Sequence, residues 1–371
     1  MLSHGPIQEL PLSLPVFRKQ ISAFLEECGL RMDEGLEHYY AYVGPDGRIL
    51  AGAGLEADII KCVAVSPEAR STGMLPPIIS MLMSECSSSS GITSFKVFTK
   101  PENSEIFHSL GFKTLARAPK AILMENGRGL ENYCEYLRHA ALSRHARLRP
   151  GISSGVIVMN ANPFTLGHKY LIEKALEQVD HLFVIPVKED RSAFPYSERI
   201  AMIRSAVMPG PDQASALPSA EENYFSGQCP KNQFSPANAS PAHADATTVI
   251  SSEAEGGVEK SHITVLEGSS YIISSATFPT YFLKDLSEAS ETQMLLDLDL
   301  FRNHIMQALG ATVRFVGSET LDPLTERYNS LMQELIPGTV IIPRIEVPAS
   351  ALPTAEENYF SGQCPKNQFS P

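Results

Sequence analysis

GVIVMNANPFTLGHKYLIEKALEQVDHLFVIPV, residues 155–187, is the stretch that decides the fold of the second half of this chain. Gly155–Met159 is an apolar run of strand length, Leu166–Val179 carries apolar residues at helical spacing, and His181–Val187 is a second apolar run. Two strands joined through one helix form a βαβ unit with parallel strands. The sequence therefore predicts a doubly wound parallel sheet with a Rossmann-like arrangement.

The candidate ligand site is the junction NANPFTLGH, residues 160–168, between the first strand and its helix. Ligands of parallel sheets bind beyond the carboxyl ends of the strands, and a helix N-terminus offers unpaired N–H groups to anions. Gly167 lets a nucleotide approach the backbone, while Thr165 and His168 project donors toward phosphate oxygens. An imidazole there can stabilise the charge that develops at the α-phosphorus as pyrophosphate leaves.

Neighbouring residues have supporting roles in the same interpretation. Asn160 and Asn162 tie down the loop, and Lys169 adds a cation. A plainer alternative stays open, in which Thr165 is only a helix N-cap and His168 is a solvated residue of the first turn.

Length and composition limit the class of protein. A chain of 371 residues predicts two domains, and its net charge of −12 argues against a general nucleic-acid binder, which needs a basic face. The six cysteines have no CxxC spacing, so we expect reduced thiols rather than a zinc site or a disulfide framework. The start lacks the pattern of a signal peptide, and no stretch has about 18 uninterrupted apolar residues. We therefore expect a cytoplasmic protein without a membrane partner.

The pattern of helix and strand signals divides the chain. We expect a first domain of mixed helices and strands over residues 1–126, a helical connector over 127–151 and the parallel-sheet domain over 152–347. The expected strands are 39–43, 48–56, 58–65, 94–100, 155–159, 181–187, 263–268, 312–319 and 338–345, and the expected helices are 16–30, 75–86, 127–145, 166–179, 196–207, 300–310 and 324–336.

Two segments fall outside this pattern. Residues from about 209 to 262 are poor in apolar side chains, which predicts a disordered insertion in the second domain. The segment 214–236 within it recurs at 349–371 with 22 of 23 positions identical, in a tail that we place at 348–371. Two separated copies do not form a stacked repeat fold. A duplicated interaction peptide and a recent duplication or gene-model defect are both compatible with this pattern.

The second domain resembles a known family. The stretch VIVMNANPFTLGHKYLIEKA, residues 156–175, resembles the (H/T)xGH nucleotidyltransferase superfamily, and within it the [citrate (pro-3S)-lyase] ligase family. The resemblance continues through residues 182–203, 263–285 and 314–337. The run YIISSATFPTYFLK, residues 271–284, is far more specific than the Thr-x-Gly-His pattern.

The first domain also resembles part of that family, whose members carry an N-terminal acetyltransferase-like domain of GNAT type, an α+β fold. VAVSPEARSTGML, residues 63–75, resembles the loop that cradles a CoA pyrophosphate, and the resemblance implies that Arg70 and Gly73 bind a CoA-like arm. The ending NSEIFHSLGFKTL, residues 103–115, is similar to that of the same fold. The family pattern has a small residue at the position of Leu75. The bulk of this leucine works against a close approach of phosphate to the backbone.

The family resemblance implies an activity. Members activate acetate with ATP and Mg²⁺, release pyrophosphate, and pass the acetyl group to the thiol of the phosphoribosyl-dephospho-CoA prosthetic group on the citrate lyase acyl carrier protein. No permanently bound cofactor or metal site is implied. On this chain the implied catalytic residues are Thr165, His168 and Lys169. The implied ATP-binding residues are Asn160, Asn162, Pro163, Phe164, Gly167, Arg191, Arg199, Gly317 and Glu319, with Arg191 and Arg199 as candidates to neutralise pyrophosphate.

One part of the family pattern is missing. Members follow the last strand with an Ile-Ser-x-Ser-x-x-Arg motif that supplies further phosphate ligands, whereas this chain departs from the pattern after IIPRIEVP, residues 341–348. Two alternatives to an active ligase therefore stay open. One is an adenylyl- or cytidylyltransferase acting on a phosphorylated small molecule, and the other is a catalytically impaired nucleotide-binding homologue.

Overall fold

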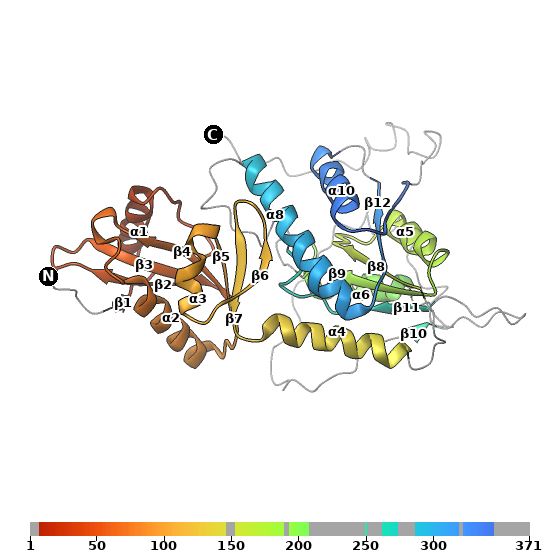
Figure 1. Ribbon diagram of the computed structural model, residues 1–371, viewed down its shortest axis with the longest axis horizontal. Coiled ribbons are helices and arrows are strands. Elements are labelled where there is room, and N and C mark those ends of the chain that lie inside the picture. Colours follow the sequence, from red (N-terminus) through yellow and green to blue (C-terminus); the bar gives the residue numbers. More distant parts are fainter. Residues whose placement is uncertain are drawn as a thin grey trace, which may run out of the picture.

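The computed structural model describes residues 7–145, 153–188, 193–207, 249–250, 262–273, 286–318 and 322–344. Its two sheets lie side by side along the long axis of the molecule (Figure 1). The predicted tail at 348–371 and most of the predicted insertion at 209–262 lie outside the described residues. Within the described part of the chain, no helix is both long and apolar enough to cross a membrane.

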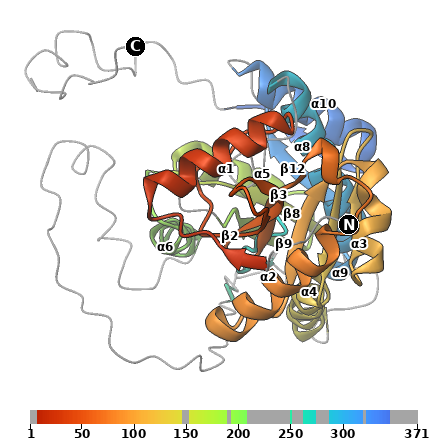
Figure 2. The same ribbon diagram turned by 90° about the vertical axis from the view of Figure 1, so that its left-hand side faces the viewer.

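The first sheet has seven strands in the order β1-β2-β3-β4-β5-β7-β6. Its strands are β1 (Ile7–Glu9), β2 (His38–Val43), β3 (Ile49–Glu56), β4 (Ile59–Val65), β5 (Phe95–Thr99), β6 (Lys113–Arg117) and β7 (Ile122–Asn126), and its helices are α1 (Pro15–Glu27), α2 (Leu75–Ser90) and α3 (Ser104–Ser109). Successive residues of β2 enter the cores on opposite faces, Tyr39 beneath α1 and Tyr40 beneath α2. Figure 2 shows α1 and α2 on these two faces.

One strand pair in the first sheet opens a ligand-sized space. All neighbouring strands are antiparallel except β4 and β5, whose register joins only Ile59 and Ile60 to Lys96 and Val97. Beyond that point the two strands no longer pair, and the later residues of both line a cavity.

The second sheet has the order β10-β11-β9-β8-β12-β13, and every pair is parallel except β10 with β11. The strands are β8 (Ser154–Met159), β9 (His181–Pro186), β10 (Val249–Ile250), β11 (His262–Val265), β12 (Val313–Gly317) and β13 (Thr339–Ile342). The helices are α4 (Gly129–His145), α5 (Leu166–Leu176), α6 (Tyr196–Val207), α8 (Leu286–Leu300), α9 (Met306–Leu309) and α10 (Pro323–Leu335). Buried residues of α5 and α6 pack on one face of the sheet, and those of α4, α8 and α10 pack on the other. This arrangement confirms the predicted doubly wound parallel sheet.

The two halves share one hydrophobic core. Phe98, Ala116 and Leu123 of the first sheet belong to the same buried cluster as the α4 and α8 side chains. Polar contacts add to this interface, because the backbone N–H of Arg117 donates to Asp299 Oδ2 at 2.8 Å. The α8 helix therefore packs both against β6 and over the second sheet (Figure 1).

The expected elements agree with the structure in type, but the structure also has β1, α3, β6 and β7, which the sequence analysis did not predict. The helix expected at 300–310 is the end of a longer helical run that begins at Leu286 and includes a π-helical turn over Phe301–Ile305. Val249 and Ile250, inside the predicted insertion, form a short strand on β11. A two-residue strand has no distinctive local signal, since it exists only through its pairing partner.

Candidate active site

A cleft of about 460 Å³ lies at the carboxyl edge of the parallel sheet. Its floor includes Val158 of β8 and Val316 of β12, which occupy the face of the sheet that α8 and α10 cover. The first turn of α5 and the loop after β13 border its mouth. This is the edge at which parallel α/β sheets bind ligands.

Thr165 and His168 form a reciprocal contact at the start of α5. Thr165 is the N-cap residue, and its backbone N–H donates to His168 Nδ1 at 3.0 Å. The Thr165 hydroxyl is 2.8 Å from the same nitrogen. Because Nδ1 accepts the backbone proton, the neutral imidazole carries its own proton on Nε2. The cap therefore leaves the His168 Nε2–H as a donor for an anion in the cleft.

The environment of His168 keeps the imidazole neutral. Burial, together with the positive charge of Arg344, lowers the pKa of His168 below its ordinary value. The ring stacks on Phe164 with the centroids 5.5 Å apart and an interplanar angle of 29°. A neutral, oriented imidazole donates a hydrogen bond to a phosphate oxygen without bringing a second full charge beside Arg344.

Arg199 of α6 fixes the loop that precedes α5. It is fully buried, and its guanidinium donates to the carbonyl oxygens of Asn160, Val187 and Phe194 at 2.9, 2.9 and 3.0 Å. Its Nη1 is also 2.7 Å from Asn160 Oδ1. The loop includes Ala161 at a φ of 49°, a left-handed conformation that is strained for a residue with a Cβ. Arg199 thus holds a strained loop in place.

The structure brings only some of the sequence-predicted residues into the cleft. Those that line it are Asn160, Thr165, Gly167, His168 and Gly317. Asn162, Pro163 and Phe164 belong to the supporting loop, where Asn162 Oδ1 accepts the backbone N–H of Phe194 at 3.1 Å and the Asn162–Pro163 peptide bond is cis. A Cβ at Gly167 would meet only ordinary contacts, so the space beside it is open.

The basic residues that were predicted to bind ATP are not among the described residues that line the cleft. Lys169 is exposed on α5, with its Nζ 3.9 Å from Glu173 Oε1, and it is not among the residues that line the cleft. Arg199 lies beneath the loop rather than in the cleft. Arg191 and Glu319 lie outside the described residues.

Two arginines that the sequence analysis did not select also line the cleft. Arg344 follows β13 by two positions, and its backbone N–H donates to Ser318 Oγ at 2.9 Å. Arg314 lies on β12 and is buried. A signal for Arg344 exists in the sequence, because a residue just after a parallel strand lies at the ligand-binding edge. Arg314 carries no such signal, since a charged residue inside a strand is usually exposed.

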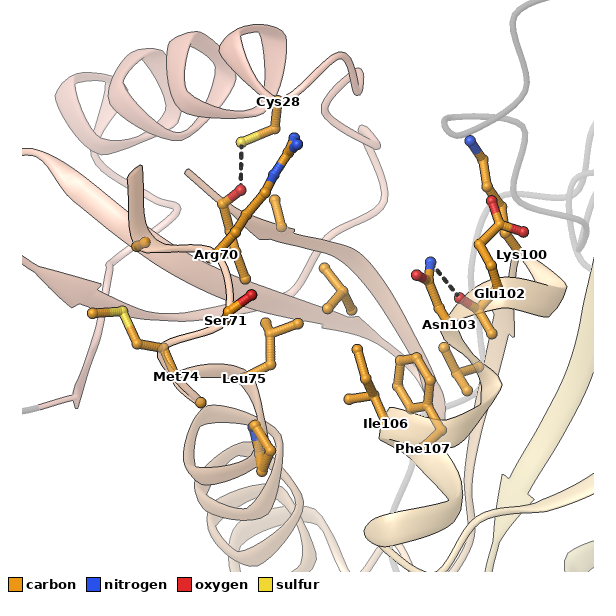
Figure 3. A pocket seen from close by; sticks show the side chains of 18 of the residues that line it. Cys28, Arg70, Ser71, Met74, Leu75, Lys100, Glu102, Asn103, Ile106 and Phe107 are labelled. Carbon is orange, nitrogen blue, oxygen red and sulfur yellow. Dashed lines mark hydrogen bonds between the residues drawn. The ribbon is translucent and has the colours of Figure 1, made fainter. Parts of the chain in front are cut away.

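A second cavity, of about 830 Å³, lies in the first domain where β4 and β5 separate (Figure 3). One wall is the loop from Arg70 to Leu75, in which Ser71 and Gly73 have left-handed φ angles of 63° and 74°. The opposite wall carries Lys100, Asn103, Ile106 and Phe107. Arg70, Gly73 and Leu75, the three positions marked by the sequence pattern, all line this cavity.

Cys28 projects toward the same cavity near Arg70 (Figure 3). Its thiol donates to the carbonyl oxygen of Val65 at 3.5 Å. Burial raises the pKa of the Cys28 thiol, and the charge of Arg70 opposes this only in part. The thiol is therefore protonated at neutral pH, so it is not poised as a nucleophile.

Comparisons with known proteins fit this architecture. A parallel sheet with a cleft at the carboxyl ends of its strands, beside the N-terminus of a crossover helix, is typical of nucleotide-binding α/β proteins. Residues 154–209 and 245–359 match the family described as the citrate lyase ligase C-terminal domain. The chain is 34% identical over 344 residues to the [citrate [pro-3S]-lyase] ligase of Haemophilus influenzae, covering 92% of this chain and 85% of the relative. The [citrate [pro-3S]-lyase] ligase of Klebsiella pneumoniae is 33% identical over 332 residues, covering 89% and 80%. This chain belongs to the citrate lyase ligase family.

Solved structures are similar to about a third of the chain. An acyl-CoA N-acyltransferase from Pseudomonas aeruginosa covers 33% of this chain and 99% of its own, with 14% identity and a TM-score of 0.29. Escherichia coli ElaA covers 33% and 98%, with 15% identity and a TM-score of 0.28.

Proposed function

We propose that this chain is an acid–thiol ligase that activates acetate with MgATP and acetylates the prosthetic-group thiol of the citrate lyase acyl carrier protein. In the first step, an acetate oxygen attacks the α-phosphorus of ATP, so that an acyl–phosphate bond forms and pyrophosphate leaves. In the second step, the thiol sulfur attacks the acetyl carbonyl, the acyl–phosphate bond breaks and AMP leaves. The thiol proton is lost to solvent or a base.

The observation that carries this proposal is the cleft in which Thr165, His168 and Arg344 meet. The negative charge that grows on the departing pyrophosphate needs donors that are already in place. In the proposed complex, His168 Nε2–H donates to a phosphate oxygen, Arg344 neutralises charge, and the N–H groups at the start of α5 bind further oxygens. Family membership supports the choice of ligase over other nucleotide-dependent transferases.

Magnesium enters this scheme as part of the nucleotide substrate. Among the described residues, no three His, Cys, Asp or Glu side chains gather to hold a metal ion. Asp297 is the one carboxylate among the described residues that line the cleft, and it already accepts hydrogen bonds from Ile273 and Tyr328.

For the first domain, we propose that the cavity between β4 and β5 receives the prosthetic arm of the acyl carrier protein. Its apolar floor, which includes Val65 and Val97, suits a flexible chain with few charges. Arg70 at its mouth supplies a cation for the phosphates of such an arm. Gly73 has a left-handed backbone conformation, which favours glycine, so no side chain at this position narrows the loop.

The first step is tested by acetate-dependent exchange of labelled pyrophosphate into ATP. The proposal predicts exchange in the wild type and a loss of about a hundredfold or more in His168→Ala. Lys169→Ala is the matched control, because Lys169 is exposed on the same helical turn and does not line the cleft. A folded wild-type protein without exchange would refute the proposed chemistry.

The arm site is tested with two glycine variants of equal conformational cost. Gly73→Ala and Gly91→Ala each place a Cβ on a left-handed residue, at φ angles of 74° and 68°, with no atom within 4 Å of the new carbon. Both should cost about 1 kcal/mol of stability. Only Gly73→Ala should weaken acetyl transfer to the holo acyl carrier protein, followed by mass spectrometry. Equal transfer by the two variants would rule out the cavity as the arm site.

A further inference from the structure

The inner end of the cleft contains a buried cation. The Arg314 side chain on β12 is 3% exposed and lies among residues of α8, α10 and the π-helical turn. Its guanidinium carbon is 4.0 Å from the centre of the Phe301 ring. Its Nη2 donates to the Tyr328 hydroxyl at 3.1 Å and is 4.0 Å from Asp297 Oδ2.

The hydrogen bonds of this group are incomplete. Asp297 Oδ1 accepts the backbone N–H of Ile273 at 3.0 Å, and Asp297 Oδ2 accepts the Tyr328 hydroxyl, so each carboxylate oxygen already accepts one hydrogen bond. Arg314 Nε and Nη1 are buried and have no acceptor among the described residues. A buried donor without an acceptor is costly, and such a group in a native protein calls for an ion, a ligand or an ordered water.

The surroundings of Arg314 define the chemistry of a ligand. Val158, Ile273, Met294 and Val316 provide an apolar surface within the same cleft. Arg314 offers one positive charge, and Asp297 Oδ2 at 4.0 Å already balances part of it, so the site suits a ligand with a single negative charge better than one with several. A small monocarboxylate with a short alkyl group meets both conditions, since its charge pairs with the guanidinium and its alkyl group contacts the apolar surface.

We propose that Arg314 binds the carboxylate of the acid substrate and that the apolar residues beside it limit the length of the alkyl group. This subsite rests on the proposed ligase function, whose nucleotide phosphates occupy the other end of the cleft at Thr165, His168 and Arg344. The acid is thereby held in the same cleft as the α-phosphorus that it attacks. Arg314 acts as a substrate-binding residue, and its neighbour Tyr328 orients the guanidinium.

Binding without turnover gives the first test. Isotope-labelled acetate is titrated into the wild type and into Arg314→Met by NMR in the presence of a non-hydrolysable ATP analogue, with acetamide as an uncharged ligand of the same shape. We expect acetate to bind the wild type at least about tenfold more tightly than acetamide, and to bind Arg314→Met at least about tenfold more weakly than the wild type. Arg327→Met is the matched control, because Arg327 pairs with Glu291 on the exposed side of α10 and should leave acetate binding unchanged.

Two further outcomes decide the proposal. Should Arg314→Met fail to fold, Arg314→Lys carries the same test, because lysine keeps the charge but not the planar guanidinium. Acetate binding that is equal in the wild type and the folded Arg314 variant would overturn the subsite. Inorganic phosphate that binds in an Arg314-dependent way and displaces acetate would also overturn it, since the site would then be a phosphate site.

Turnover separates this subsite from the ligase function. In the pyrophosphate exchange assay, the Arg314 variant should raise the KM for acetate by about tenfold or more and leave the KM for ATP within about twofold. Exchange with an unchanged acetate KM would overturn the subsite and leave the ligase function standing. Absence of exchange in a wild type that binds acetate through Arg314 would overturn the ligase function and leave the subsite standing.

Discussion

Replacing Arg199 by methionine tests whether this residue holds the loop or binds the nucleotide. The substitution keeps most of the apolar stem and removes the guanidinium. Three carbonyl oxygens, those of Asn160, Val187 and Phe194, then lose their donor. At about 1–1.5 kcal/mol for each acceptor, the expected loss in the free energy of unfolding is about 3–5 kcal/mol.

The assay is urea unfolding followed by far-UV circular dichroism, because the chain has no tryptophan to report by fluorescence. Arg204→Met is the matched control on the same helix. Arg204 Nη2 is 2.7 Å from Glu267 Oε1 in a half-exposed ion pair, which predicts a loss of about 0.5–1 kcal/mol.

The competing hypothesis makes the opposite prediction. If Arg199 were a pyrophosphate ligand, Arg199→Met would abolish pyrophosphate exchange while the unfolding midpoint stayed close to that of the wild type. A measured loss of stability below about 1 kcal/mol would therefore refute the loop-holding role.

Three smaller predictions concern other parts of the structure. Tyr271→Phe removes the hydroxyl that donates to the buried Glu125 across the domain interface and should cost about 1.5–3 kcal/mol in urea unfolding, whereas a cost near zero would show that water replaces the contact. The pKa of His168 is lower in the folded chain than in the unfolded chain, so the stability of the wild type should fall as the pH drops through and below about 6.5. In His168→Gln this loss of stability toward acid pH should be smaller, and identical melting curves of the two proteins from pH 7 to 5 would contradict the assignment. Asp180 Oδ2 accepts the hydroxyl and the backbone N–H of Ser153 at 2.7 and 2.8 Å, and these hydrogen bonds lower the pKa of Asp180. Asp180→Asn should therefore be less stable than the wild type at neutral pH. In thermal unfolding, this difference in stability should shrink as the pH falls below about 4.

The sequence alone determined the local elements and the position of the junction between β8 and α5. The apolar runs and helical spacing in residues 155–187 predicted β8, α5 and β9, because these signals come from residues adjacent in the chain. Thr165 and His168 could be selected for the same reason, since a helix start and its first turn are read within a few residues.

Only the tertiary structure decided which charged side chains meet in the cleft. His168 and Arg344 are far apart in the chain and line the same cleft because β12 pairs with both β8 and β13. Lys169 is next to His168 in sequence, yet the helical turn directs it toward Glu173. Arg199 and Arg314 are buried because other segments pack over them, and local spacing carries no information about that packing. Secondary structure follows from neighbours in sequence, whereas a binding site depends on the strand order and on helices brought together from distant segments.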